Sequence, residues 1–331
     1  MSTMQAVMLT KKGGPEVLKM VELPLPEPGP GEVRVKIRAT GVGATDITMR
    51  RGTYPYAPPI PFIPGYESIG IIDAVGAGVT TLKEGDRVCA LLVYGGYATH
   101  VVRGAEHWGK VPDGLDDAEA VSLILNYVTA YQMIHRKARL QPGQSALVNA
   151  ANGGVGQALL DLLRAHGVSA IGAAAKVRHA IVSSYGAIPI EGRSASLDAG
   201  VREIRSEGVD AAFDGVGGSS TGQCVSSTRR RGITIWYGFV GARELSPLVR
   251  SALSLFVGSR LRGRRGSFYG ITMMYRKDPY PFREDLATLF DLLAQKKIVP
   301  RIAQKLPLLN AREANERLEA GGVEGKIVLM A

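Results

Sequence analysis

The chain has 331 residues, of which 45% are hydrophobic and 21% are charged. This composition excludes an intrinsically disordered protein, because such chains bury too little apolar surface to offset the entropy lost on folding. No run of about 18 apolar residues is present, so a membrane-spanning helix is not expected. A length prior of ~150 residues per domain suggests about two domains.

The charge balance of the chain is basic. Lysine and arginine number 40, and aspartate and glutamate 30, which gives a formal net charge of +10. The excess is dense at Arg229–Arg231 and Arg260–Arg265, and it favours a solvated basic surface. No zinc-finger spacing or RNA-binding aromatic motif accompanies it, so nucleic acid and membranes are not expected as partners. Two cysteines and an N-terminus without signal-peptide features predict a cytoplasmic protein.

Residues 1–110 are predicted to form strands and turns. The segment 32–39 (EVRVKIRA) alternates apolar and charged residues, as a half-buried strand does. Further strands are predicted at 68–75, 86–93 and 97–102, and the last two are expected to form a hairpin across Gly95-Gly96. This region is expected to be a compact β domain.

From Asp116 onward, the apolar residues change to helical spacing. A helix is predicted at 118–136; strands at 145–150, 170–174, 211–214 and 232–237 then alternate with helices at 155–166, 176–185 and 197–207. Helices at 282–296 and 311–320 and a strand at 326–330 complete the chain. The alternation predicts an α/β fold with a doubly wound parallel sheet.

A glycine-rich turn follows the strand at 145–150 (SALVNA) and leads directly into a helix. Ala151, Gly153 and Gly156 occupy the three small-residue positions of the dinucleotide-binding fingerprint. Such a turn lets the backbone approach a pyrophosphate, and the helix N-terminus offers free N–H groups to it. The alternative is a turn without a ligand. The candidate contacts are Asn152, Gly153, Gly154, Val155 and Gly156.

The residues after the next strand favour NADP(H) over NAD(H). An NAD site needs an acidic side chain about 20 residues after the turn, to bind the ribose 2′-hydroxyl. Here the chain reads Ala173-Ala174-Ala175-Lys176-Val177-Arg178, without a carboxylate. Ala174, Lys176 and Arg178 would therefore surround a 2′-phosphate. The alternative is that both cations face water at the start of a helix.

Several short motifs follow one another along nearly the whole chain: Gly41–Asp46, Arg50–Gly52, Pro64–Glu67, Val75–Val79, Gly85–Val88, Asn126–Tyr131, the glycine turn, Phe213–Gly218 and Gly325–Lys326. Their order resembles the medium-chain dehydrogenase/reductase superfamily, specifically its zinc-free quinone oxidoreductase (zeta-crystallin-like) branch. Residues 126–131 are most similar to the vesicle amine transport protein subgroup. The resemblance implies a GroES-like substrate domain over 1–125, a Rossmann NADP(H)-binding domain over 126–265, and a return to the first domain over 266–331.

A zinc site is not expected from the residues present. Structural zinc in the zinc-dependent relatives needs four cysteines, and this chain has two. The position of the first catalytic ligand holds Gly43, and the usual histidine before Glu67 is replaced by Tyr66. Without a metal, hydride would pass from a nicotinamide to an easily reduced substrate.

The resemblance also implies roles for individual residues. Thr45 falls where the zinc enzymes keep a proton-relay hydroxyl. Asp46 is adjacent to it, either as an acid or as a structural hydrogen-bond acceptor. Thr48 is expected to line the substrate cleft, and Tyr54 either approaches the same cleft or packs in the core or at the surface. Members of the branch often have asparagine where this chain has Gly43 and tyrosine where it has Thr48. Both positions would line the substrate cleft, so the identity of the substrate stays open. Further cofactor contacts expected by position are Asn126, Thr129, Arg193, Tyr237, Gly238, Phe239, Phe268 and Lys326.

Three functions fit these features. They are an NADPH-dependent quinone reductase, an NADPH-dependent reductase of activated C=C bonds of the 2-enal or enoyl type, and an NADPH-binding protein with low turnover. The third would act as a sensor, or through its basic surface on RNA or membranes. A homodimer is also expected, because relatives often pair the edges of their Rossmann sheets. The candidate edge segment is Gly258–Tyr269.

Overall fold

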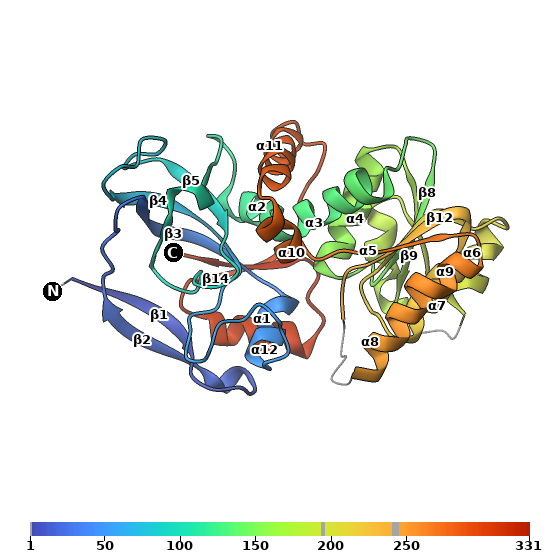
Figure 1. The fold of residues 1–331 in the computed structure, drawn as a ribbon, viewed down its shortest axis with the longest axis horizontal. Helices are drawn as coiled ribbons and strands as arrows, with labels where there is room; N and C mark the ends of the chain where they lie inside the picture. The colour runs from blue at the N-terminus through green and yellow to red at the C-terminus, as the bar shows by residue number, and fades with distance from the viewer. Residues whose placement is uncertain (1, 193–195, 240–244) are drawn as a thin grey trace. The chain divides into compact units, whose positions relative to one another are not determined.

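The computed structural model describes all residues except 1, 193–195 and 240–244. The chain divides into two compact units (Figure 1), one formed by Met1–Leu125 with Leu286–Ala331 and the other by Asn126–Asp285. The return to the first unit therefore begins at Leu286, and not at 266. The reason is that β13 (Arg265–Phe268) pairs with the sheet of the second unit, and the Asp285 carboxylate accepts from Arg136 Nε there at 2.7 Å.

The first unit is built on a seven-stranded sheet with the order β14-β15-β3-β4-β5-β7, in which β6 also pairs with β3. Its strands are β3 (Glu32–Val42), β4 (Glu67–Val75), β5 (Arg87–Leu91), β6 (His100–Gly104), β7 (Gly109–Lys110), β14 (Ile302–Pro307) and β15 (Lys326–Met330). A two-stranded sheet of β1 (Thr3–Leu9) and β2 (Leu18–Pro24) accompanies it. Because β15 pairs antiparallel with β3, the C-terminal strand lies within the sheet of the first unit.

The α-helices that belong wholly or partly to this unit are α1 (Ala44–Arg50), α2 (Asp117–Ser122), α11 (Tyr280–Ala294) and α12 (Ala311–Ala320). The predicted hairpin of 86–93 and 97–102 is wrong. β5 pairs with β4 and β7, whereas β6 pairs with β3, where Val101 lies opposite Val35. Between β5 and β6, Val93 (φ 69°) and Gly95 (φ 109°) adopt left-handed conformations, and the chain does not fold back on β5.

The second unit contains a six-stranded parallel sheet within the described residues, with the order β10-β9-β8-β11-β12-β13. This is the 3-2-1-4-5-6 order of a Rossmann fold. Its strands are β8 (Ser145–Asn149), β9 (Ser169–Ala174), β10 (Ile188–Glu191), β11 (Val209–Asp214), β12 (Thr228–Trp236) and β13. All five residues of β8 are buried, as expected for a parallel strand covered on both faces.

Helices connect these strands. They are α4 (Gly154–Ala165), the short turn Lys176–Arg178 continued by α5 (His179–Ser184), α6 (Leu197–Ile204), α7 (Ser219–Ser227), the helical run α8 (Leu245–Ala252) to α9 (Ser259–Leu261), and α10 (Ile271–Lys277). Side chains of β8, β9, β11, α6 and α7 share one apolar core, with Leu147, Ile171 and Val201 fully or almost fully buried. The alternation of strands and helices predicted the parallel sheet correctly.

The helix predicted at 118–136 is present as one helical run from Asp117 to Ala138. It contains two π-helical segments, Leu123–Tyr127 and Gln132–Ala138, on either side of α3 (Val128–Tyr131). π-Helical turns inside α-helices are frequent at functional sites. Asn126 lies in the first of them and Thr129 in α3, and both side chains are buried.

Candidate functional site

The turn between β8 and α4 has the geometry that the dinucleotide fingerprint requires. Ala150 has φ 61°, which reverses the chain after the strand. A Cβ atom on Gly156 would lie 2.2 Å from the carbonyl oxygen of Ala150, so only glycine fits there. A Cβ on Gly153 would be 3.3 Å from the same oxygen. The first turn of α4 therefore approaches the end of β8 closely, and a helix N-terminus in this position is suited to bind an anion.

This turn lies at the topological switch point of the sheet. β8 pairs with β9 on one side and with β11 on the other, so consecutive connections leave the sheet in opposite directions here. Ligands of open α/β sheets bind in the crevice at such a point. The Asn126 amide lies against the turn, because a Cβ on Gly154 would be 2.7 Å from Asn126 Nδ2. The structure therefore brings Asn126 to the predicted residues 152–156.

Asp214 at the end of β11 organises this edge of the sheet, a role that the sequence did not indicate. Its fully buried carboxylate accepts hydrogen bonds from Asn149 Nδ2 (3.0 Å), Thr221 Oγ1 (2.7 Å) and the Val216 N–H (3.0 Å). Buried carboxylates are retained when several donors surround them. Asp214 thereby fixes the ends of β8 and β11 on both sides of the crevice.

The predicted 2′-phosphate residues lie at the end of β9, where the structure adds an unexpected carboxylate. Ala174 is buried and the Lys176 side chain is exposed. Glu191 of the neighbouring strand β10 pairs in register with Ala174, and its Oε2 accepts from the Lys176 N–H at 3.1 Å. The sequence signal that could have revealed this carboxylate is Glu191 itself, an acidic residue at the end of the strand after β9. Arg193, also predicted here, lies outside the described residues.

Aromatic side chains gather at the ends of β12 and β13. The Trp236 ring lies 4.7 Å from the Phe239 ring and 5.3 Å from the Phe268 ring, both edge to face. Tyr237 packs over Gly215, where a Cβ would lie 2.7 Å from its hydroxyl, and burial raises its pKa. Phe239 and Phe268, predicted as cofactor contacts together with Tyr237 and Gly238, thus share one cluster.

The predicted catalytic residues of the first unit lie on and after α1. Thr48 Oγ1 donates to the carbonyl oxygen of Thr45 at 2.8 Å, so this hydroxyl is engaged within the helix. The Tyr54 hydroxyl lies 2.5 Å from the Tyr66 hydroxyl. Tyr66 is buried and Tyr54 is half-buried. The sequence indicated Tyr54 but did not indicate that Tyr66, at the usual histidine position, would form a phenol pair with it.

Lys326 forms a buried ion pair with Glu67. Their Nζ and Oε1 atoms are 2.5 Å apart, and the side chains are 5% and 0% exposed. The other carboxylate oxygen of Glu67 accepts from the Leu125 N–H at 2.7 Å. A Cβ on Gly41 would lie 2.1 Å from Glu67 Oε1, so the glycine makes room for the pair. Lys326, which was predicted to contact the cofactor, is thus paired with Glu67 inside the first unit.

Asp46 is buried beside Tyr97 and Asn315. Its Oδ2 accepts from the Gly43 N–H at 2.9 Å, whereas its Oδ1, the Tyr97 hydroxyl and Asn315 Oδ1 are buried without a completed hydrogen bond among the described residues. The Tyr97 hydroxyl faces both Asp46 and Asn315. Asn315 Nδ2 donates one of its two hydrogens to the Ala311 carbonyl oxygen. The Asp46 carboxyl is thus buried with one backbone donor, and such burial favours its protonated form.

Burial accordingly raises the pKa of Asp46 from 3.8 to about 6, although the Gly43 N–H and Lys326 oppose the shift. An acid with a raised folded-state pKa favours folding most at low pH, and this contribution falls between pH 3.8 and about 6. We expect Asp46→Asn, which can make the same hydrogen bonds as the protonated acid, to raise the free energy of unfolding at pH 7.5 by ~1–3 kcal/mol.

Urea unfolding of Asp46→Asn and the unmodified protein between pH 4 and pH 8 measures this effect. The difference between the two proteins should vanish near pH 4, where both side chains are neutral. Asp46→Ala, which loses both hydrogen bonds, is the control and should be destabilised at every pH. A constant difference between pH 4 and pH 8 would contradict the assignment.

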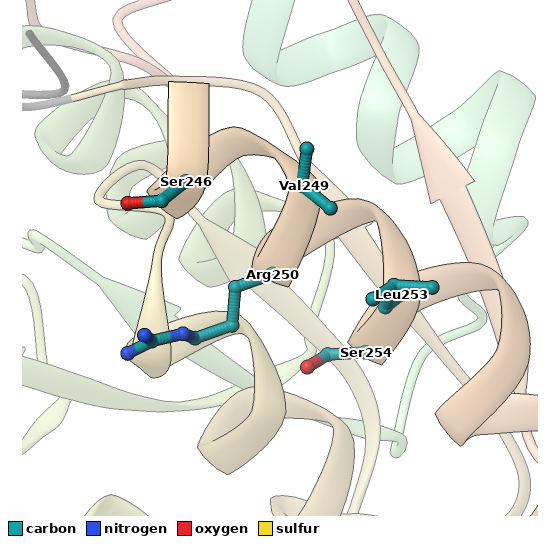
Figure 2. Close-up of a pocket in the computed structure, with 5 residues that line it drawn as sticks. All are labelled: Ser246, Val249, Arg250, Leu253 and Ser254. Atoms are coloured by element: carbon teal, nitrogen blue, oxygen red, sulfur yellow. The ribbon is translucent and has the colours of Figure 1, made fainter. Parts of the chain in front are cut away.

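Three further observations concern other kinds of site. In the part of the chain that the structure describes, no group of three histidine, cysteine, aspartate or glutamate residues is placed to hold a metal ion. Among the same residues, no helix is long and apolar enough to cross a membrane. An open hollow of about 580 Å³ lies along α8 and the helical residues that follow it (Figure 2), and none of the predicted site residues lines it.

The first unit is thus a β-sheet unit that buries Asp46, Tyr97 and the Glu67–Lys326 pair. The second is a Rossmann unit with a dinucleotide-binding turn. The alcohol dehydrogenase GroES-like domain matches residues 29–113, and the zinc-binding dehydrogenase domain matches residues 186–329. The synaptic vesicle membrane protein VAT-1 homolog of Danio rerio is 32% identical over 99% of this chain and 70% of its own length. Human quinone oxidoreductase is 29% identical over 99% of this chain and 98% of its own length.

Solved structures of similar proteins have the same fold over nearly the whole chain. The human VAT-1 homolog-like protein has a TM-score of 0.86 at 29% identity, covering 100% of this chain and 99% of that chain. A mycobacterial protein solved in complex with NADPH has a TM-score of 0.85 at 30% identity, covering 99% of this chain and 100% of that chain. The chain belongs to the zeta-crystallin-like quinone oxidoreductase branch of the medium-chain dehydrogenase/reductase superfamily, a family of oxidoreductases.

Proposed function

We propose that the protein is an NADPH-dependent oxidoreductase that transfers hydride to a quinone or a similar electrophile without a metal. The observation that carries the proposal is the turn at Gly153–Gly156, whose glycines leave room for the close backbone and which brings the N-terminus of α4 to the switch point as a pyrophosphate cradle. The relative solved with NADPH and the relatives named quinone oxidoreductase support the cofactor and the substrate class.

The proposed reaction adds a hydride and a proton to the substrate. NADPH supplies the hydride when it is bound. The phenol pair can hold the proton: if Tyr66 donates to Tyr54 Oη across their 2.5 Å contact, the hydroxyl hydrogen of Tyr54 points away from Tyr66. The buried Tyr66 would then orient the half-buried Tyr54. Gly43 and Tyr66 offer neither imidazole nor thiolate, so polarisation of the substrate falls to hydrogen bonds.

The test is turnover with NADPH against matched quinones and 2-enals, with the zinc content of the purified protein measured in parallel. We expect quinone turnover, less than stoichiometric zinc, and no loss of rate after treatment with a chelator. Tyr54→Phe should lower kcat by roughly 10²-fold, in the range of a lost general acid, while the Kd of NADPH stays unchanged.

The matched control is Tyr56→Phe, which removes the hydroxyl of a neighbouring tyrosine whose ring lies 5.8 Å from the Tyr54 ring, and which should leave kcat nearly unchanged. Turnover of enals alone would assign the protein to the C=C reductases instead. NADPH binding without turnover of either class would favour the low-turnover binding protein, and one tightly held zinc per chain would contradict the metal-free mechanism.

We also propose a homodimer. β13 lies at the end of the strand order and pairs only with β12 among the described strands, so it leaves one edge without a partner. This strand lies within the predicted segment Gly258–Tyr269. Sedimentation at micromolar concentration should give twice the mass of one chain. The Tyr269 N–H donates to the Trp236 carbonyl oxygen of β12, and N–H groups alternate in direction along a strand, so the Phe268 N–H faces the open edge. Phe268→Pro removes this N–H and should shift the protein toward monomer. A monomeric mass for the unmodified protein would contradict the proposal.

A further inference from the structure

The net charge of the protein is concentrated in one stretch of its sequence. Between Asp214 and Asp278 the chain carries eleven basic residues against one acidic residue, Glu244, which is a surplus of ten. The whole chain has 40 basic and 30 acidic residues, so the rest carries 29 of each. The net charge of +10 thus arises entirely between positions 215 and 277.

Much of this charge lies at the end of the sheet opposite the glycine turn. All six strands of the Rossmann sheet are parallel, and the glycine turn follows the carboxyl end of β8. Arg229–Arg231 instead occupy the amino end of β12, and Arg264 and Arg265 lie at the start of β13. The Arg231 N–H donates to the Gly263 carbonyl oxygen at 2.8 Å, so the two strand starts are adjacent. These cations therefore lie away from the edge where a dinucleotide binds.

Three guanidinium groups converge at this end. Arg202 Nη2 of α6 and Arg264 Nη2 donate to the same acceptor, the Ser226 carbonyl oxygen, at 3.0 and 3.3 Å. Burial lowers the pKa of Arg264, and the positive charges of Arg202 and Arg262 lower it further. Like charges held this close repel one another unless an anion lies between them.

No carboxylate relieves this repulsion within the described residues. Arg202, Arg262 and Arg264 make no ion pair there, and their hydrogen bonds go to backbone carbonyl oxygens. Arg264 Nε is buried and has no hydrogen-bond partner in the same part of the chain. The C-terminus of α7 at Ser226 carries only about half a negative charge, which one cation would balance. The arrangement therefore has donors and positive charge in excess of its acceptors.

We propose that Arg202, Arg262 and Arg264 form a binding site for a phosphate-bearing anion at the amino end of the Rossmann sheet. Guanidinium groups bind phosphate oxygens through paired, charge-assisted hydrogen bonds. The phosphate belongs either to a soluble polyphosphate or to the headgroup of an anionic lipid. This site is separate from the cofactor edge and does not depend on which substrate the enzyme reduces.

The test is calorimetric titration with inorganic pyrophosphate in the presence of saturating NADPH, so that the glycine turn cannot take up the probe. A second arm measures co-sedimentation with vesicles of phosphatidylcholine alone or with phosphatidic acid added. We expect binding in at least one arm, weakened at least tenfold in Arg202→Gln/Arg262→Gln/Arg264→Gln and by rising salt. Pyrophosphate binding alone identifies a soluble ligand, and binding only to the acidic vesicles identifies a lipid headgroup.

The matched control is Lys19→Gln/Lys36→Gln/Lys83→Gln, which removes three exposed positive charges from the first unit and should bind as the unmodified protein does. Arg262→Gln alone keeps the proposal testable if the triple variant does not fold, because the exposed Arg262 side chain contacts only the Gly258 carbonyl oxygen among the hydrogen bonds of the described residues. Absence of binding in both arms, or an equal loss in the lysine control, would overturn the proposal.

Discussion

Lys326→Met is expected to destabilise the first unit by ~3–5 kcal/mol, because it leaves the Glu67 carboxylate buried without its counter-ion. Glu67 is fully buried, and its Oε1 faces Lys326 Nζ at 2.5 Å. The cost arises from the charge left behind and not from the net strength of the pair. Urea unfolding of Lys326→Met measures it, followed by the fluorescence of the buried Trp108 in a Trp236→Phe background.

The double variant Glu67→Gln/Lys326→Met is the control. The glutamine carbonyl can still accept from the Leu125 N–H, which Glu67 now does at 2.7 Å, while the uncompensated charge disappears. We therefore expect the double variant to recover most of the lost stability. If Lys326→Met unfolds within about 1 kcal/mol of the unmodified protein, within the range of an exposed pair, the ion pair is not buried in solution.

NADPH is expected to bind more tightly than NADH by roughly 10- to 1,000-fold. Lys176 and Arg178 follow β9, and one or two charge-assisted hydrogen bonds to a 2′-phosphate contribute roughly 1.5–3 kcal/mol each. Exposed Lys176 is screened by salt, so the preference should shrink as ionic strength rises. Fluorescence titration with both cofactors measures the ratio.

Lys176→Ala/Arg178→Ala should weaken NADPH and leave NADH nearly unchanged, whereas Lys11→Ala/Lys12→Ala, an exposed pair in the other unit, should change neither. Glu191 adds a test that only the structure suggests. Its carboxylate lies 3.1 Å from the Lys176 backbone nitrogen, where it would repel a phosphate, so Glu191→Gln should raise the preference for NADPH further. Equal affinities for both cofactors in the unmodified protein would contradict the NADP(H) assignment.

The sequence by itself determined the features that arise from neighbouring residues. The glycine turn could be predicted because a buried strand, a turn and a helix follow one another within 145–166, and each has its own local pattern. The parallel sheet followed from the alternation of strands and helices. Gly156 was recognised from spacing, and the structure gives the physical reason: its Cβ would lie 2.2 Å from the Ala150 carbonyl oxygen.

The tertiary structure decided which distant residues meet, because periodicity encodes which face of an element is buried and not what covers it. Two strands next to each other in sequence, β5 and β6, were expected to pair, yet each pairs with other strands. Glu67 and Lys326, Asp46 with Tyr97 and Asn315, and Glu191 beside Lys176 come from separate elements. Their protonation and pairing depend on burial and on partners, which exist only once the chain has folded.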